Sequence, residues 1–321
     1  MNNSSLPLVV ILFLSLTALL CCDKPVHKDT SSHQPFRLLV LGNVQDGGSP
    51  HIGCNKSCCK ELFEKPDPNR KVVSLGLIDA AEKKTFMFEA TPDFPTQTKQ
   101  LNRDARFKHR EEPHGVFLTH AHIGHYSGLM YLGMEAMNAR KTPVYVMPRM
   151  DSFLSENGPW DQLVSYNNIE LERIHDQETV SVTSAINVTP FRVPHRDEYS
   201  ETVGYRISGP NRSALFIPDI DKWSKWDKSI IDEIKSVDYA FVDGTFYNDN
   251  ELVNRNMSDI PHPFVVESLE LFAELDKNER KKIYFIHFNH TNPLLNVDSE
   301  ETKNVLQKGF NIARIGDEFN L

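Results

Sequence analysis

The apolar residues of this chain fall into short runs that are mostly bounded by Gly, Pro or polar residues. Runs of about four to eight apolar residues between turn-forming residues are typical of buried β-strands. The pattern predicts strands over Phe36–Gly42, Lys71–Asp79, Thr85–Glu89, Gly115–Thr119, Pro143–Met147, Ile169–Ile174, Ala185–Val193, Thr202–Ile207, Ala214–Ile217, Asp238–Val242 and Ile283–His287.

Segments of helical character lie between and after these runs. They predict helices over Phe94–Asp104, Tyr126–Ala139, Trp226–Lys235, Phe264–Leu275 and Ser299–Lys308. Strands precede and alternate with the helices without a strict βαβ rhythm, which favours two sheets packed face to face with helices outside them, an α/β sandwich. Because no repeat, low-complexity tract or obvious linker divides the body, we predict one domain from residue 36 to residue 321. Residues 159–168 and 247–263 are interpreted as loops on the substrate side.

The first residues form a segment of a different kind. Leu6–Leu20 is an almost unbroken apolar run that ends at Cys21-Cys22-Asp23. Its length is typical of a signal-peptide core and is short for a membrane span. The segment resembles a bacterial lipoprotein signal, which implies that Cys22 is lipidated, with Cys21 as the alternative. We therefore predict a signal peptide over residues 1–22 and a polar tether over residues 23–35. The protein would be exported and either anchored to a bacterial membrane by its lipid or periplasmic. A plain signal peptide and an uncleaved anchor are the alternatives.

Composition narrows the classes of function. The chain has 321 residues, a formal net charge of −9, 25% charged and 40% hydrophobic residues, which excludes a disordered tail protein and a multi-span membrane protein. The acidic excess excludes a protein that coats nucleic acid, because counterion release needs a basic surface. The sequence carries no signal for the oligomeric state. Its 13 His and 5 clustered Cys direct attention to metal chemistry instead.

The strongest chemical signal is the segment Thr119-His-Ala-His-Ile-Gly-His125, directly after a predicted strand. It places His120, His122 and His125 within six residues. Imidazole nitrogens bind Zn²⁺, iron and related ions, and loops at strand ends are where a rigid scaffold presents ligands. Surface or capping histidines are the alternative interpretation.

This pattern, with Gly128 and Leu129 following it, resembles the metallo-β-lactamase fold superfamily. The resemblance implies a four-layer αββα sandwich, and three later segments match in order. They are Val193-Pro-His195, Phe216-Ile-Pro-Asp219 and Tyr284-Phe-Ile-His287. Within the superfamily the chain looks closest to the pyrroloquinoline-quinone biosynthesis protein B type and to the cyclic-phosphate phosphodiesterase of phosphonate metabolism. The segments that suggest this are Gly42-Asn-Val-Gln-Asp-Gly-Gly-Ser-Pro50, Pro194-His-Arg-Asp-Glu-Tyr199 and Asn289-His-Thr-Asn-Pro293.

The resemblance implies two metal positions that share Asp219. The first has His120, His122, His195 and Asp219 as ligands, and the second has His125, His287 and Asp219. The superfamily usually has an aspartate before the third histidine of the loop, as a ligand of the second ion, and here that residue is Gly124. Two imidazoles and one carboxylate also suit non-haem iron. We expect zinc, as one or two ions, with iron and manganese as alternatives.

A second cluster follows the Gly-Gly turn. Cys54-x-x-x-Cys58-Cys59 supplies three thiolates, one ligand short of a tetrahedral zinc site. The related proteins carry a structural zinc on a Cys-rich turn here, and in the phosphodiesterase a histidine three residues after the active-site one completes it. His290 stands at that distance from His287. The resemblance thus implies a structural zinc on Cys54, Cys58, Cys59 and His290, and a disulfide plus one free thiol is the alternative.

The metal ligands predict a function. We expect an exported hydrolase that uses a metal-bound hydroxide on a small-molecule substrate, with a phosphodiester as one candidate. Asp219 would orient the hydroxide, and His125 with His287 would stabilise the developing oxyanion. Asp243 is either a carboxylate behind a ligand imidazole or a turn residue. His262 is interpreted as a loop histidine without a ligand role.

Two other functions fit the same residues. One is an iron-dependent oxidative enzyme, or an accessory protein similar to the quinone-biosynthesis protein B. The other is a non-catalytic metal carrier, which the glycine at position 124 favours.

Overall fold

The computed structural model describes residues 34–108, 110–251 and 260–321, besides Met1. Its strands form two seven-stranded sheets, in the orders β14-β1-β2-β3-β4-β5-β6 and β13-β12-β11-β10-β9-β8-β7. The strands of the first sheet are β1 Phe36–Gly42, β2 Ser74–Asp79, β3 Lys84–Phe88, β4 Gly115–Phe117, β5 Thr142–Val146, β6 Ile169–Arg173 and β14 Glu318–Asn320. Those of the second sheet are β7 Val180–Ser181, β8 Asn187–Arg192, β9 Val203–Ser208, β10 Ser213–Ile217, β11 Tyr239–Asp243, β12 Ile283–Ile286 and β13 Asn311–Ile312.

Short helices connect these strands. The α-helices are α1 Ser57–Lys60, α2 Phe94–Ala105, α3 Ile123–Tyr126, α4 Pro148–Glu156, α5 Trp160–Ser165, α6 Ile230–Lys235, α7 Val265–Leu271, α8 Lys277–Arg280 and α9 Glu300–Gln307. The 3₁₀ turns are η1 Glu61–Phe63, η2 Ser127–Leu132, η3 Trp223–Lys225, η5 Phe272–Glu274 and η6 Pro293–Leu295. None of the helices in the described ranges has the length and apolar character needed to cross a bilayer.

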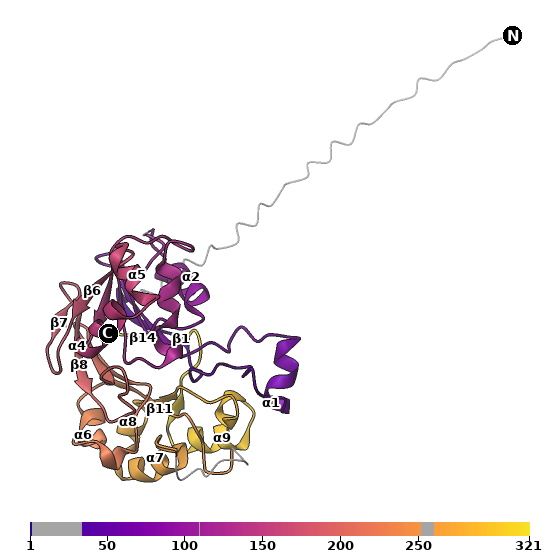
Figure 1. Cartoon of the computed structure of the whole chain (residues 1–321). Coiled ribbons are helices and arrows are strands. Elements are labelled where there is room, and N and C mark those ends of the chain that lie inside the picture. Colours follow the sequence, from indigo (N-terminus) through magenta and orange to yellow (C-terminus); the bar gives the residue numbers. More distant parts are fainter. Residues whose placement is uncertain (2–33, 109, 252–259) are drawn as a thin grey trace. The chain divides into compact units, whose positions relative to one another are not determined.

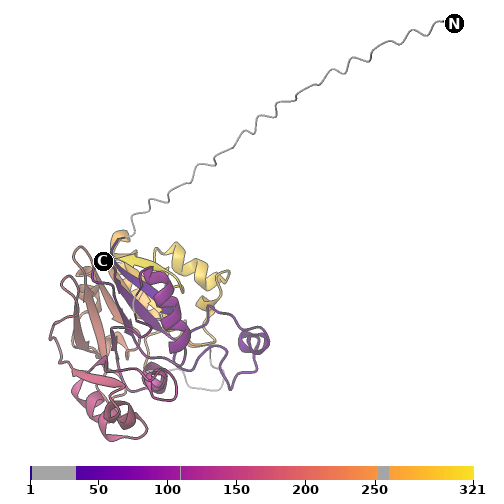
Figure 2. The ribbon, with the colours of Figure 1, turned by 90° about the horizontal axis from the view of Figure 1, so that it is seen from above.

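The alternation of side chains along the strands produces four layers. In β1, Leu38 and Val40 face the space between the sheets, whereas Leu39 and Leu41 pack towards α2. In β10, Phe216 faces the other sheet and Leu215 packs towards the outer helices. Figure 1 shows α2 and α5 at one side of the strands and α6, α7 and α9 at the other. Figure 2, seen from above, shows α2 (purple) in front of the strands. The predicted αββα sandwich is confirmed.

Several predicted elements differ in extent. The helix predicted over Tyr126–Ala139 is replaced by the single turn α3 and the 3₁₀ turn η2. The reason is that Gly128 N donates to Ala90 O, so the backbone is bound to the end of β3 instead of to its own preceding turn. The helix predicted from Trp226 begins only at Ile230, because the Ser229 hydroxyl accepts from Asp232 N and caps the helix there.

Other elements were not predicted. The segment predicted as a loop over residues 159–168 contains α5, whose Leu163 is buried against the first sheet's helices. The strands β7, β13 and β14 are two or three residues long and are defined by pairing with a neighbour. Such short pairings leave no periodic signal in the sequence.

The N-terminal predictions lie outside the described residues. The chain divides into Met1–His33 and Gln34–Leu321, and every element above belongs to the second unit. The predicted signal peptide over residues 1–22, lipidation at Cys22 and most of the tether over residues 23–35 fall in the first unit. They stay predictions from the sequence.

Candidate metal centre

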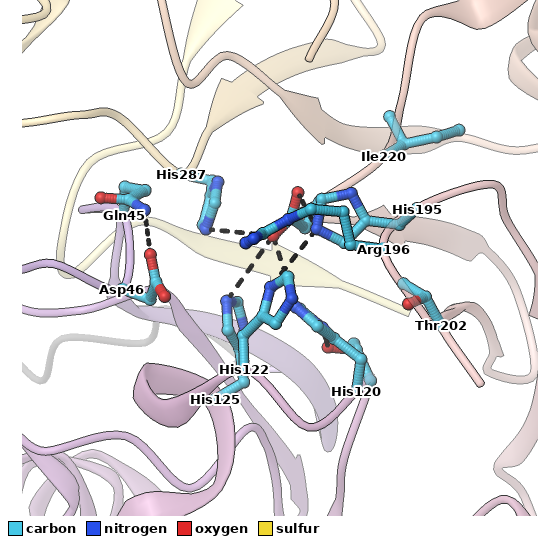
Figure 3. Close-up of polar contacts among 12 residues, drawn as sticks. Gln45, Asp46, His120, His122, His125, His195, Arg196, Thr202, Ile220 and His287 are labelled. Carbon is cyan, nitrogen blue, oxygen red and sulfur yellow. Dashed lines mark hydrogen bonds and ion pairs between the residues drawn. The ribbon is translucent and has the colours of Figure 1, made fainter. Parts of the chain in front are cut away.

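Five histidines and one aspartate converge where strands of both sheets end (Figure 3). They are His120, His122 and His125 after β4, His195 after β8, Asp219 after β10 and His287 after β12. Since β4 belongs to the first sheet and β8, β10 and β12 to the second, the centre is assembled across the interface between the sheets.

The first predicted set, His120, His122, His195 and Asp219, has its ligand atoms within 4.8 Å of one another. His120 Nε2 lies 3.4 Å from Asp219 Oδ2, and His195 Nε2 lies 3.2 Å from Asp219 Oδ1. His122 Nδ1 lies 3.4 Å from His195 Nε2. Two atoms that are each about 2.0–2.1 Å from one tetrahedral zinc ion lie about 3.3 Å apart. The spacings therefore fit a single tetrahedral ion.

The second predicted set, His125, His287 and Asp219, also gathers within 4.8 Å and is fully buried. His125 Nε2 and His287 Nε2 lie 3.9 Å and 4.0 Å from Asp219 Oδ2. An ion held by these three groups would have at least one coordination position that no predicted residue fills. The structure thus brings together every active-site residue that the sequence predicted.

Further side chains orient the imidazoles. Thr119 Oγ1 lies 2.8 Å from His120 Nδ1, and Thr245 Oγ1 lies 2.8 Å from His287 Nδ1. A partner on Nδ1 leaves Nε2 of each ring to face the centre.

Two carboxylates act in the same way on the other rings. Glu89 Oε1 lies 3.4 Å from His125 Nδ1, and Asp221 Oδ1 lies 3.3 Å from His195 Nδ1. Neither carboxylate was predicted from the sequence, and Glu89 is fully buried.

The donor atoms that face the centre lack other partners. The buried Nε2 atoms of His120, His125 and His287 and the buried Oδ1 of Asp219 make no regular hydrogen bond within the described part of the chain, and their near neighbours are the other side chains of the centre. A buried polar atom without a partner costs about 1–3 kcal/mol, so such a group of four atoms indicates a missing ligand. Imidazole and carboxylate together suit zinc, iron or manganese.

The electrostatics differ among the ligand imidazoles. At His195 burial lowers the pKa, but Asp219 raises it to about 10. Burial lowers the pKa of both His120 and His287 well below its usual value. Burial would raise the pKa of Asp219, but His195 and His262 hold it well below its usual range. A neutral imidazole and an ionised carboxylate are the forms that bind a metal ion.

His262, interpreted from the sequence as a loop histidine without a ligand role, lies at this centre. Its Nδ1 lies 2.9 Å from Asp243 Oδ2 and 3.2 Å from Asp219 Oδ1. Asp243 accepts from Ile220 N and from Thr245, so its side chain is fixed from several directions. Asp243 thus stands behind both His262 and, through Thr245, the imidazole of His287.

Two residues of the centre have a strained backbone. Glu89 has φ +78° and His287 has φ +68°, in the left-handed region that non-glycine residues rarely adopt. Each such residue costs about 1–3 kcal/mol, and the conformation persists because neighbouring contacts hold it. At His287 it turns the chain so that the imidazole enters the centre while Phe288 N donates to Asn43 O.

The cysteine cluster assembles as predicted. The ligand atoms of Cys54, Cys58, Cys59 and His290 lie within 4.8 Å of one another. Cys58 Sγ lies 3.7 Å from Cys54 Sγ and 3.9 Å from Cys59 Sγ. Two sulfurs each about 2.3 Å from a tetrahedral zinc ion lie about 3.8 Å apart. All three cysteines are free thiols, so the alternative of a disulfide is wrong for this structure.

His290 is in the neutral form that can bind a cation, whereas the Cys58 thiol is protonated in its present surroundings. Burial, and then the neighbouring Cys54 thiol, raises the pKa of Cys58 to about 12. Burial and the nearby His51, whose ring stacks on it at 4.6 Å between centroids, lower the pKa of His290 to about 4. His290 Nδ1 is buried without a hydrogen-bond partner in the described residues. A bound cation would ionise the thiols and use the neutral imidazole.

Replacing Cys58 by Ser is expected to remove one tightly bound zinc ion per chain and leave the active-site ions in place. A serine hydroxyl is a much weaker zinc ligand than a thiolate. Elemental analysis after dialysis against a mild chelator measures this, with Ser57→Ala, an exposed change on the same helix, as the control. An unchanged zinc content would show that Cys58 is not a ligand.

Comparison with known proteins identifies the family of this chain. A family model described as the beta-lactamase superfamily domain matches residues 84–288. Coenzyme PQQ synthesis protein B of Xanthomonas euvesicatoria is 26% identical over 318 residues, covering 89% of this chain and all of that protein. The corresponding protein of Methylorubrum populi is 24% identical, covering 88% of this chain and 98% of that protein.

Two solved structures share the fold. The crystal structure of Zn²⁺-bound PqqB from Methylobacterium extorquens has a TM-score of 0.73 at 22% identity, over 89% of this chain and all of that one. A diphosphatase from the PhnP family has a TM-score of 0.60 at 22% identity, over 89% of this chain and 97% of that one. At this identity the likeness is one of fold.

Proposed function

Since the chain belongs to the beta-lactamase superfamily, we propose that it is a metal-dependent hydrolase that cleaves a phosphodiester in a small molecule. The observation that carries the proposal is the convergence of His120, His122, His195 and Asp219, whose ligand atoms lie within 4.8 Å of one another, beside buried histidine nitrogens that make no hydrogen bond in the described residues. Zinc is the proposed metal, supported by the zinc bound to PqqB in a structure of the same fold. Export and lipidation at Cys22 are part of the proposal and rest on the N-terminal sequence alone.

A bound divalent ion would supply two kinds of chemistry, acidification of a water molecule and polarisation of a substrate oxygen. The protein side chains do the rest. Asp219 and the histidines position the reacting groups, and His125 and His287 line the side on which negative charge develops.

His262 is placed to handle the proton of the leaving group. Burial opposes protonation, but Asp243 and Asp219 raise the pKa of His262 above its usual value. Because Nδ1 contacts both carboxylates, Nε2 is the nitrogen that can give a proton to the departing oxygen. Asp243 orients the protonated ring and stabilises its charge.

The surroundings favour an anionic substrate with an organic group. Arg196, an exposed cation, lies beside His122. Burial first, and then His195 and Arg196, lower the pKa of that imidazole. A hollow of about 430 Å³ is lined by Arg149, Phe153 and Tyr199 among others. It also includes Glu198, whose Oε2 lies 3.5 Å from His122 Nε2, so the hollow adjoins the first position.

Bis(p-nitrophenyl) phosphate, offered with zinc, manganese or iron, tests the proposal. We expect turnover that His122→Ala removes. If no metal supports turnover of this diester by the intact protein, the hydrolase proposal fails. Oxygen-dependent turnover with iron bound would instead support the oxidative alternative, which the ligand set of His125, His287 and Asp219 favours.

His262→Ala is expected to slow cleavage by about 10²–10⁴-fold for an alkyl phosphodiester and much less for the p-nitrophenyl ester. An alkoxide needs a proton to depart, whereas p-nitrophenolate does not. Metal content should stay that of the unmodified protein, and His175→Ala, at an exposed histidine, is the control. If His262→Ala slowed the cleavage of both esters by the same factor, that result would contradict the role of His262 as proton donor.

A further inference from the structure

The glycine at position 124 is in contact with a loop that was not predicted to join the centre. The loop follows β1 and contains Gln45 and Asp46. A Cβ atom at position 124 would lie 2.3 Å from Asp46 Cβ, 2.6 Å from Asp46 Cα and 2.8 Å from Asp46 O. Asp46 therefore occupies the space in which the side chain of an aspartate at position 124 would begin.

The loop is held in this place by the backbone. Gln45 N donates to Phe288 O and Phe288 N donates to Asn43 O, both at 2.8 Å. Val44 bridges both Val72 and Phe288. Because Phe288 directly follows His287, these contacts fix the loop against the segment that presents a ligand of the second position.

The side chain of Asp46 lies beside the second metal position (Figure 3). Figure 3 shows Asp46 on the side of the centre where His125 and His287 lie, with Gln45 donating from Nε2 to Asp46 Oδ1. One donated hydrogen bond leaves a carboxylate able to accept at further lone pairs.

We propose that Asp46 takes the place of the carboxylate that position 124 lacks, and completes the second metal position with His125, His287 and Asp219. The unpartnered Nε2 atoms of His125 and His287, both fully buried, mark that position. Glycine at position 124 is then the condition for the arrangement, because only a residue without Cβ admits the Asp46 backbone. The inference rests on the proposed function only in assuming that the centre binds metal.

The test titrates the metal-free full chain with Co²⁺ and follows binding by calorimetry and absorbance. Coordination by thiolates adds a sulfur-to-metal band, which separates the cysteine cluster from the two nitrogen- and oxygen-liganded positions. We expect Asp46→Asn to weaken the binding of the second of these ions by about 10–100-fold and to leave the first unchanged. Asp161→Asn, at an exposed aspartate, is the control.

Asp46→Glu keeps the negative charge but moves the carboxylate. We expect it to restore part of the affinity for the second ion that Asp46→Asn loses. The proposal is overturned if Asp46→Asn binds the second ion as tightly as the unmodified protein, if both ions weaken equally, or if the unmodified centre binds a single ion. Absence of phosphodiester cleavage would defeat the proposed function and leave these titrations, and the inference, untouched.

Discussion

Asp219→Asn is expected to empty both active-site positions and leave the zinc of the cysteine cluster in place. The carboxylate of Asp219 faces both sets. His195 Nε2 of the first set lies 3.2 Å from Oδ1, and His125 Nε2 and His287 Nε2 of the second lie 3.9 Å and 4.0 Å from Oδ2. Asparagine keeps the shape of the side chain but removes its charge and one acceptor. Replacing a residue that only orients a metal ligand weakens metal binding by about 10–100-fold. Replacing Asp219, a ligand shared by both ions, should weaken it more.

Hydrolysis should fall with the metal. Removing one electrostatic group at an active site lowers turnover by about 10²–10³-fold, and here the metal and the orienting carboxylate are lost together, so we expect a decrease of at least about 10³-fold. Metal content per chain, measured beside turnover, checks both parts. Cys58→Ser should remove the zinc of the cysteine cluster and keep the active-site ions and turnover. Asp227→Asn, at an exposed aspartate, should change neither metal content nor turnover. Retention of the active-site ions by Asp219→Asn would mean that the metal binds elsewhere.

Gly124→Asp, which introduces the residue that the superfamily usually has at this position, is expected to destabilise the protein without improving metal binding. The new Cβ would meet backbone and Cβ atoms of Asp46 at 2.3–2.8 Å, and a backbone held by Phe288 cannot rotate away as a flexible side chain would. Overpacking of this kind costs about 1–3 kcal/mol, and each kcal/mol lowers Tm by roughly 2–4 °C in a domain of this size.

Gly124→Ala separates the effect of Cβ from that of the carboxylate and should lower Tm to a similar degree. Gly158→Ala is the matched control, because a Cβ there would come no closer than 3.7 Å to Asp161. Thermal unfolding of the metal-free proteins measures the difference. A Gly124→Asp protein that is as stable as the original and binds the second ion more tightly would show that the loop moves aside freely.

The layers of the fold follow from local features that can be recognised in a single sequence. The apolar runs of β1, β10 and β12 are buried on both faces, and such strands are recognisable as continuous hydrophobic segments. Helix α9 begins after Ser299, whose hydroxyl accepts from Thr302 N, and this signal is local. By contrast, β13 is defined by pairing with β12, and no local pattern specifies a partner so distant along the chain.

The metal centre likewise combines residues that the local sequence reveals with residues that only the fold brings together. The ligand histidines are recognisable because three of them share one loop, and Thr119, next to His120, could have been found from adjacency. Glu89 and Asp46 could not, because their roles depend on where β3 and β1 end relative to β4. His262 lacks a neighbouring motif, and its role becomes visible only through its contact with Asp243.

The division of the ligands between the sheets has a consequence for stability. His120 and His122 follow a strand of one sheet, and His195 and Asp219 follow strands of the other. An ion held by all four is a cross-link that must be broken before the sheets can separate. By thermodynamic linkage, an ion at about 1,000 times its dissociation constant would add about 4 kcal/mol to the free energy of unfolding. The fraction of folded protein would then depend on the supply of free metal in its compartment.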